Sequence, residues 1–158
     1  MEIETEIKKI TNNSILIFFI SLGLVFYYFY GFYTNENSSG AGGYNNDFGL
    51  IWGNLNLFKD GILYNLNNPE YTDSRPPLSY ILHIFFNPFI HDKDTFRLST
   101  LLISIIVPIL LFCSIKENYS MMNKSVCLLL ALILTLSPYF RTTAFWALGE
   151  NYGYIFLI

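Results

Sequence analysis

The chain of 158 residues has the length of one ordinary soluble domain, but its composition argues against that class of protein. Hydrophobic residues make up 53% of the sequence and charged residues only 13%, about half of the usual ~25% in soluble domains. A net charge of -3 without any basic cluster excludes a protein that binds nucleic acid through its charge. The high aromatic content of 18% fits a chain that contacts lipid and the membrane interface.

Residues 14–33 are predicted to form a first transmembrane helix. The segment has no charged residue, and about 20 helical residues at ~1.5 Å each cross a ~30 Å hydrocarbon core. It ends in aromatic residues instead of the small residues of a signal-peptide cleavage site, which favours an uncleaved anchor. Lys8 and Lys9 predict a cytoplasmic N-terminus. We interpret the aromatic residues 27–33 as a belt at the outer interface rather than a platform for stacking sugars.

Residues 34–94 are therefore expected to form a loop on the outer face of the membrane. Within it, residues 44–58 carry apolar side chains at mixed helical spacings, which predicts a short amphipathic helix at the membrane surface. Trp52 is expected to lie at the interface. The run Lys59-Asp60-Gly61 ends this helix.

A second juxtamembrane helix is predicted over residues 76–90. This segment is apolar, too short for a full span, and broken near Pro88. A proline at 76 or 77 suits its first turn, where a missing N–H has no cost. Residues 63–74, between the two helices, have the composition of an irregular loop.

Two further spans are predicted over residues 95–115, where Pro108 should cause a kink, and over residues 125–146. The turn at 116–124 contains two lysines, which indicates the cytoplasmic side. The apolar run 152–158 is too short to cross a membrane, so we expect a chain truncated within a fourth span. The sequence thus predicts an all-α, polytopic membrane protein, and residues 1–158 are its N-terminal part.

Several polar features lie on the predicted outer face. Asp47 lies near the start of the first surface helix, and the motif Arg75-Pro76-Pro77-Leu78-Ser79-Tyr80 opens the second. Arg97 lies near the outer end of the second span. Glu150 lies in the tight turn after the third span.

This order of features resembles the opening part of the GT-C superfamily of membrane glycosyltransferases. The similarity is to the branch with protein mannosyltransferases, lipid A aminoarabinose transferases and related bacterial lipopolysaccharide glycosyltransferases. Those enzymes begin with one span, a long outer loop with an early acidic residue, two juxtamembrane helices and a Lys/Arg-Pro-Pro-Leu-x-Tyr motif. Asp47 and Glu150 match the two acidic positions. The family often has Asp-Glu at the first position and Asp at the second, whereas this chain has Asp47-Phe48 and Glu150.

The resemblance implies an enzyme that transfers a sugar from a polyprenyl-phosphate donor to a lipid, glycan or protein acceptor of the cell envelope. The expected location is the outer face of a bacterial inner (plasma) membrane. Asp47 is the candidate general base, and Glu150 would assist acceptor binding or hold a divalent metal with Asp47. Arg75 would bind the donor phosphate through its bidentate donors, with Tyr80 and Arg97 as further substrate-binding residues.

Each candidate also has a purely structural interpretation. Asp47 suits a helix cap, Arg75 an anchor among lipid headgroups, and Glu150 a solvated turn. Arg97 and Arg141, near the outer ends of spans, suit side chains that snorkel to the interface.

The remaining reactive side chains are interpreted as structural. His83 and His91 lack the cluster that a metal site needs, and are expected to be packing and loop residues. Cys113 and Cys127 both lie in apolar blocks, which indicates small buried hydrophobes rather than a disulfide or metal pair.

The alternative function is a non-enzymatic multi-pass membrane protein, such as a transporter or an assembly subunit. Such a protein is expected to carry ionisable residues along its spans, facing a pathway. Here those residues are concentrated at the span ends and in the outer loop. Because the donor pocket of the resembled enzymes also draws on later spans, the 158 residues are expected to be inactive by themselves.

Overall fold

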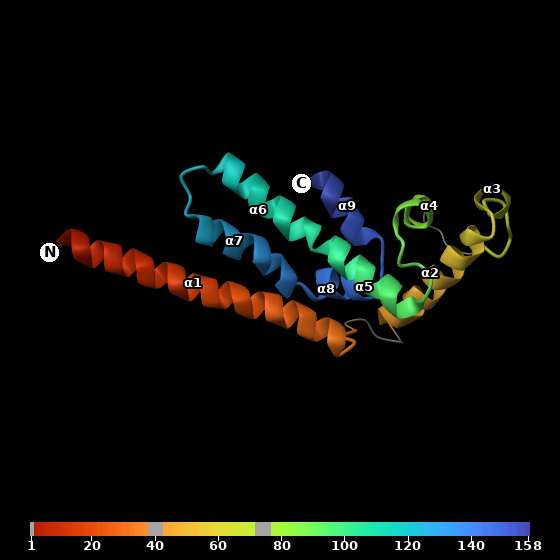
Figure 1. Cartoon of the computed structure of the whole chain (residues 1–158), viewed down its shortest axis with the longest axis horizontal. Coiled ribbons are helices and arrows are strands. Elements are labelled where there is room, and N and C mark those ends of the chain that lie inside the picture. The colour runs from red at the N-terminus through yellow and green to blue at the C-terminus, as the bar shows by residue number, and fades with distance from the viewer. Residues whose placement is uncertain (1, 38–42, 72–76) are drawn as a thin grey trace.

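The computed structural model describes residues 2–37, 43–71 and 77–158, and every regular element within those ranges is a helix (Figure 1). The all-α prediction is therefore confirmed for the described part of the chain. In chain order the helices are α1 (Glu2–Tyr33), α2 (Gly43–Lys59), α3 (Ile62–Asn65), α4 (Leu78–Phe86), α5 (Lys93–Ser104), α6 (Ile106–Asn118), α7 (Lys124–Ile133), the short 3-10 helix η1 (Leu134–Leu136), α8 (Pro138–Phe145) and α9 (Glu150–Leu157).

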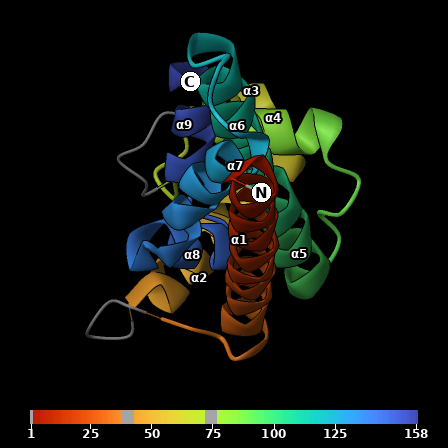
Figure 2. The ribbon, with the colours of Figure 1, turned by 90° about the vertical axis from the view of Figure 1, so that its left-hand side faces the viewer.

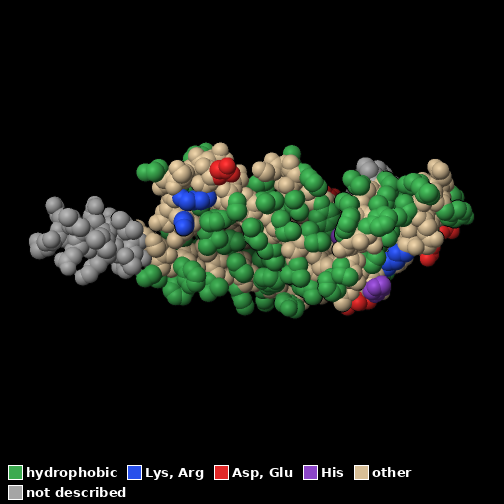
Figure 3. Space-filling view, turned by 45° about the horizontal axis from the view of Figure 1, so that its top comes forward, with side chains coloured by type: hydrophobic (Ala, Val, Ile, Leu, Met, Phe, Trp, Pro, Cys, Tyr) green, Lys and Arg blue, Asp and Glu red, His purple; other side chains and the backbone are tan. Residues whose placement is uncertain are grey.

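Two segments are long and apolar enough to cross a membrane. They are Asn13–Tyr33 of α1 and Lys93–Asn118, which comprises α5 and α6. A third candidate is Lys124–Leu136 followed by α8, if this bent pair counts as one span. On the face shown in Figure 3, hydrophobic side chains cover the middle and most charged side chains gather towards the two ends. These features are those of a membrane protein.

The long helices lie side by side as a bundle. α7 lies between α1 and α6, and α9 runs back along α6 (Figure 1 and Figure 2). At the far end from the N-terminus, α1 contacts α8 through aromatic rings. The ring centroid of Tyr28 lies 6.1 Å from that of Phe140 and 5.3 Å from that of Phe145. All three side chains are buried, so this end of the bundle has an aromatic core.

The second predicted span is interrupted where proline predicts it. α5 ends at Ser104 and α6 begins at Ile106, just before Pro108. A proline lacks the N–H that would bond to the carbonyl four residues earlier, here that of Ser104. The side chain of Ser104 bonds within α5, where its hydroxyl donates to the carbonyl of Thr100 at 2.9 Å.

The third predicted span differs from the continuous helix expected over residues 125–146. The helix axis bends by 71° between Lys124–Leu136 and α8. Ser137 has an extended ψ of 116°, and its hydroxyl accepts a hydrogen bond from the backbone N–H of Phe140 at 3.3 Å. Pro138 is then the first residue of α8, where its fixed φ starts a helix but cannot continue one. α8 is consequently buried in the end of the bundle that lies far from the N-terminus, rather than extending the span.

Both predicted surface helices, α2 and α4, are present as helices. α2 buries one face, formed by Phe48, Ile51, Leu55 and Phe58, as expected for an amphipathic helix. Gly61, with φ of 151°, follows the end of α2 in a conformation that L side chains rarely adopt. The segment predicted as irregular begins with the single turn α3.

Candidate functional site

The elements that carry the two candidate carboxylates meet beyond the end of the bundle. α2, α4 and the turn between α8 and α9 surround a small cavity of about 20 Å³, which is lined by Ile51, Ser79, Tyr80, His83, Ala147, Gly149 and Tyr152. The turn is closed by a hydrogen bond of 2.9 Å from the N–H of Leu148 to the carbonyl of Thr143. Ala147 has a positive φ of 58°, as is usual for the residue that ends a helix in this way.

Asp47 is half-buried and lies in the second turn of α2, four residues after Gly43. It therefore lies within α2 rather than at the N-cap position suggested from sequence. The neighbouring ring of Phe48 packs 6.1 Å from the ring of Trp146, at the end of α8. Glu150, also half-buried, lies four residues beyond Trp146 in the first turn of α9. Asp47 is thus carried by a helix that packs on the end of α8, and Glu150 follows that end along the chain.

Two candidate substrate-binding residues, Arg75 and Tyr80, come from the motif at 75–80. Arg75 lies outside the described residues. Tyr80 is 2% exposed, and its ring stacks on Phe58 at 5.8 Å and meets the ring of Tyr71 edge-on at 6.3 Å. These aromatic contacts position α4 against α2, and Tyr80 also lines the small cavity between them.

Arg97 is fixed between aromatic rings in the second turn of α5. Its guanidinium lies 4.0 Å from the ring centroid of Trp146 and 5.2 Å from that of Phe32. Its Nε donates to the carbonyl of Phe145 at 2.9 Å, and its Nη2 donates to Oδ1 of Asn35 at 3.0 Å. Arg97 also lines an open cavity of about 310 Å³ with Asn35, Asp94 and Thr95. The rest of the lining is mainly apolar, from Phe32, Tyr33 and Leu98, so Arg97 is the cationic group at the wall of this cavity.

The sequence suggested that Arg141 snorkels to the interface, but the structure places its side chain inside the bundle. It is 3% exposed and forms a bidentate pair with Glu36, in which Nε donates to Oε2 at 3.1 Å and Nη2 donates to Oε1. Its Nη1 donates to the carbonyl of Thr135 at 3.2 Å, and its guanidinium lies 4.3 Å from the ring of Tyr27. The bend before α8 turns this side chain into the bundle, where the pair with Glu36 offsets the cost of burying its charge.

Glu36 is a residue that sequence reasoning missed. Besides its pair with Arg141, its backbone carbonyl accepts a hydrogen bond from Nε1 of Trp146 at 2.9 Å. It thereby connects the end of α1 to both ends of α8. One signal was present in the sequence, since a basic residue near the end of an apolar span needs an acidic partner and Glu36 directly follows the first span.

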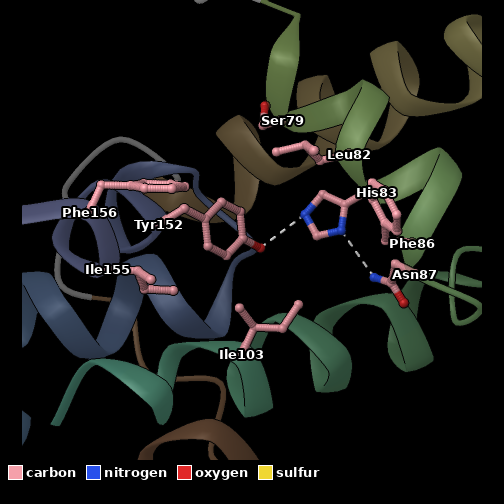
Figure 4. Close-up of a pocket in the computed structure, with 9 residues that line it drawn as sticks. All are labelled: Ser79, Leu82, His83, Phe86, Asn87, Ile103, Tyr152, Ile155 and Phe156. Carbon is pink, nitrogen blue, oxygen red and sulfur yellow. Dashed lines mark hydrogen bonds between the residues drawn. The ribbon is translucent and has the colours of Figure 1, made fainter. Parts of the chain in front are cut away.

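His83 is a buried packing residue, as predicted, and it joins three helices (Figure 4). It is 7% exposed, and burial lowers the pKa of its imidazole to about 4. Its Nδ1 lies 3.1 Å from Nδ2 of Asn87, which also donates to the hydroxyl of Ser99 at 2.8 Å. Because Nδ1 accepts, Nε2 carries the proton and donates to the hydroxyl of Tyr152 at 3.0 Å. His91, in contrast, is exposed.

An apolar cavity of about 220 Å³ opens beside His83. Its lining is mainly hydrophobic and comes from α4, α5 and α9: Ser79, Leu82, His83, Phe86, Asn87, Ile103, Tyr152, Ile155 and Phe156. A pocket with this lining suits a hydrocarbon chain, with the polar network at one wall.

The cysteines and acidic residues of the described ranges provide no assembled metal or redox centre. Cys113 and Cys127 are both free. Cys127 is buried as predicted, whereas Cys113 is exposed, so the prediction of a buried side chain is wrong for Cys113. No group of three or more His, Cys, Asp or Glu side chains that could hold a metal ion occurs among the described residues. No protein family, curated protein or solved structure matches this chain.

Proposed function

We propose that this chain is the N-terminal part of a membrane glycosyltransferase of the GT-C type. The enzyme would transfer a sugar from a polyprenyl-phosphate donor to a lipid, glycan or protein acceptor of the cell envelope. The observation that carries the proposal is that α2, which bears Asp47, packs on Trp146, four residues before Glu150, and that Arg97 lies over the same ring at one end of an apolar helix bundle. A carboxylate next to an anion-binding cation at the membrane surface suits chemistry on a lipid phosphate.

In the proposed reaction, Asp47 accepts the proton of the acceptor hydroxyl as this oxygen attacks the anomeric carbon of the donor sugar. The bond between that carbon and the phosphate oxygen breaks, and polyprenyl phosphate leaves with the electron pair. Glu150 orients the acceptor. Arg97, already held by Phe145 and Asn35, stabilises the departing phosphate from the cavity that it lines, together with Arg75.

The proposed orientation has the N-terminus in the cytoplasm and α2, α3 and α4 on the outer face. Two observations support it. Lys116 lies at the end of α6 and Lys124 at the start of α7, so both lie at the opposite end of the bundle from α2 (Figure 1). Lysines gather on the cytoplasmic side of membrane proteins, and the carboxylates would then face the envelope acceptors.

The proposal is tested with membranes from cells that express the complete gene. Membranes are supplied with polyprenyl phosphates that carry a labelled sugar, and both the released polyprenyl phosphate and the label in envelope acceptors are measured. We expect transfer by the wild-type protein and a roughly 10- to 100-fold slower rate for Glu150→Gln. Glu117→Gln, at an exposed position in the last turn of α6, is the matched control and should retain the full rate.

Absence of transfer from every polyprenyl-linked donor, with the wild-type protein correctly inserted, would contradict the proposed function. That result would favour the alternative of a non-enzymatic multi-pass membrane protein. Equal loss of activity in Glu150→Gln and Glu117→Gln would show that Glu150 has no specific role.

A further inference from the structure

The apolar cavity of about 220 Å³ beside His83 has no role in the reaction proposed above. Its accessible surface is almost entirely apolar, with a small polar part. Two of the side chains that line it, Phe86 and Phe156, are 79% and 83% exposed, so the cavity opens at an apolar surface. In a membrane protein such a surface faces hydrocarbon, and a ligand would enter the cavity from the bilayer.

A second apolar cavity, of about 240 Å³, adjoins the first. Phe86, Asn87 and Ile103 line both of them. Phe89 and Leu102 add apolar surface to the second cavity. Two adjoining apolar cavities suit a lipid with two hydrocarbon chains better than a lipid with one.

The hydrogen-bonded network at the wall of the first cavity leaves one hydrogen without an acceptor. Oδ1 of Asn87 accepts the backbone N–H of Phe89 at 2.9 Å, which fixes the orientation of the amide. Nδ2 of Asn87 therefore donates, both to the hydroxyl of Ser99 and to Nδ1 of His83. The proton of His83 is then on Nε2, which donates to the hydroxyl oxygen of Tyr152. The hydroxyl hydrogen of Tyr152 has no acceptor within the described part of the chain.

Tyr152 carries this hydrogen at the wall of the cavity. Its ring reaches from α9 towards His83, with the hydroxyl at its tip (Figure 4). Polar groups that are removed from water are almost always hydrogen-bonded, so an acceptor in the ligand is expected here. Among the described residues that line the cavity, none is Asp, Glu, Lys or Arg. An anionic group would therefore lack a counter-charge, whereas a neutral carbonyl oxygen needs only the one O–H donor.

We propose that the two cavities bind a diacyl membrane lipid, whose chains occupy them and whose ester carbonyl accepts a hydrogen bond from the hydroxyl of Tyr152. Ester carbonyls lie between the headgroups and the hydrocarbon of a bilayer, which is the depth expected for a surface helix such as α4. A polyprenyl phosphate fits less well, because it has a single chain, no carbonyl and a phosphate that needs a cation. Lipid binding of this kind does not depend on sugar transfer.

The test is native mass spectrometry of the purified full-length protein in detergent, titrated with dioleoylglycerol or with di-O-oleylglycerol. The second lipid has ether oxygens in place of the ester groups and so lacks the carbonyls. We expect saturable binding of both lipids, with the ester bound about fivefold more tightly. Tyr152→Phe should remove this preference, so that the two lipids bind equally. A general loss of packing would instead weaken both lipids and leave their ratio unchanged.

A second pair of variants tests the position of the chains. Ile103→Phe enlarges a side chain that lines both cavities, and should weaken the binding of both lipids about tenfold. Ile109→Phe is the matched control, because Ile109 is exposed and follows Ile103 in the same candidate span. It should bind both lipids as the wild type does.

Four results would overturn the proposal. Wild-type protein might bind no dioleoylglycerol, or bind the ester and the ether equally, which would assign the hydroxyl hydrogen of Tyr152 to another acceptor such as water. Tyr152→Phe could keep the wild-type preference, or Ile103→Phe could bind as Ile109→Phe does. Displacement of dioleoylglycerol by a lower concentration of undecaprenyl phosphate would assign the cavities to a polyprenyl chain.

Discussion

Two arginines hold together the end of the bundle that lies far from the N-terminus, the half-buried Arg97 and the buried Arg141. Arg97 and Arg141 each connect helices that are distant in sequence, Arg97 through the carbonyl of Phe145 and Arg141 through the carboxylate of Glu36. Both guanidiniums also lie over aromatic rings. The cation–π contacts and charge-assisted hydrogen bonds fix the position of α8, and with it the turn that leads to Glu150.

Removing the charge of Glu36 should destabilise the folded protein. Glu36→Gln leaves the buried guanidinium of Arg141 without a counter-ion, and we expect the free energy of unfolding to fall by about 3 kcal/mol. Thermal unfolding in detergent measures this change. Glu117→Gln serves as the control, because Glu117 is exposed at the other end of the bundle, and it should change stability by less than about 0.5 kcal/mol. Equal stability of the two variants would contradict a structural role for the ion pair.

At the residue scale, the sequence predicted the environment of single side chains better than it predicted their interaction partners. The burial of His83 and of Cys127 follows from composition and neighbours, whereas Cys113, predicted to be buried, is exposed. The pairing of Arg141 with Glu36 spans 105 residues and depends on the bend at Ser137. No local pattern encodes a contact of that range, and a general rule about arginine at span ends predicted the wrong environment.

At the scale of elements, three helices depend on one hydrogen-bonded network. His83 of α4 contacts Tyr152 of α9 and, through Asn87, Ser99 of α5. The imidazole also meets the ring of Phe96 edge-on at 4.9 Å. With both ring nitrogens used and little exposed surface, the neutral imidazole is the form that fits.

This network predicts a stability that falls in acid. Burial lowers the pKa of His83 to about 4 in the folded state, below the ordinary value of about 6.5. As the pH falls from about 6.5 to 4, the unfolded chain takes up a proton that the folded protein does not. The free energy of unfolding should therefore decrease through this window, by at most about 3 kcal/mol.

Measuring the free energy of unfolding at pH 7.5 and at pH 4.5 tests the direction of this pH dependence. His83→Gln cannot take up the proton, so it should lose most of the difference between the two pH values, although it is less stable at pH 7.5. His91→Gln, at an exposed position, should keep the wild-type difference. An unchanged pH dependence in His83→Gln would assign the acid sensitivity to other groups.

Elements were predictable where a local signal was strong. The apolar spacing of α2 and the prolines before α4 identify two helices, and Pro108 locates the interruption between α5 and α6. The bend before α8 was not predicted, although Pro138 was visible. A proline tolerates both a kinked span and a new helix start, and the choice depends on tertiary contacts of α8 with α1 and α5.

At the scale of the whole molecule, the proposed topology places the two ends of the bundle on opposite sides of the membrane. This topology is tested in a variant that lacks Cys113 and Cys127. A single cysteine is then introduced, either by Asp60→Cys after α2 or by Lys124→Cys at the start of α7. In intact cells, a membrane-impermeant maleimide should label the first variant and reach the second only after permeabilisation. Labelling in the reverse order would invert the proposed orientation.

The most direct test of the account is the rate of sugar transfer by Asp47→Asn, measured beside Asp60→Asn in the same membranes. Asp60 follows α2, is exposed, and is carried by the same part of the chain. If Asp47 is the general base, its substitution should slow transfer by about 10²- to 10⁴-fold while membrane insertion and Asp60→Asn activity stay at wild-type levels. A rate for Asp47→Asn within about twofold of the wild type would contradict the assignment of Asp47, because a general base contributes far more than that.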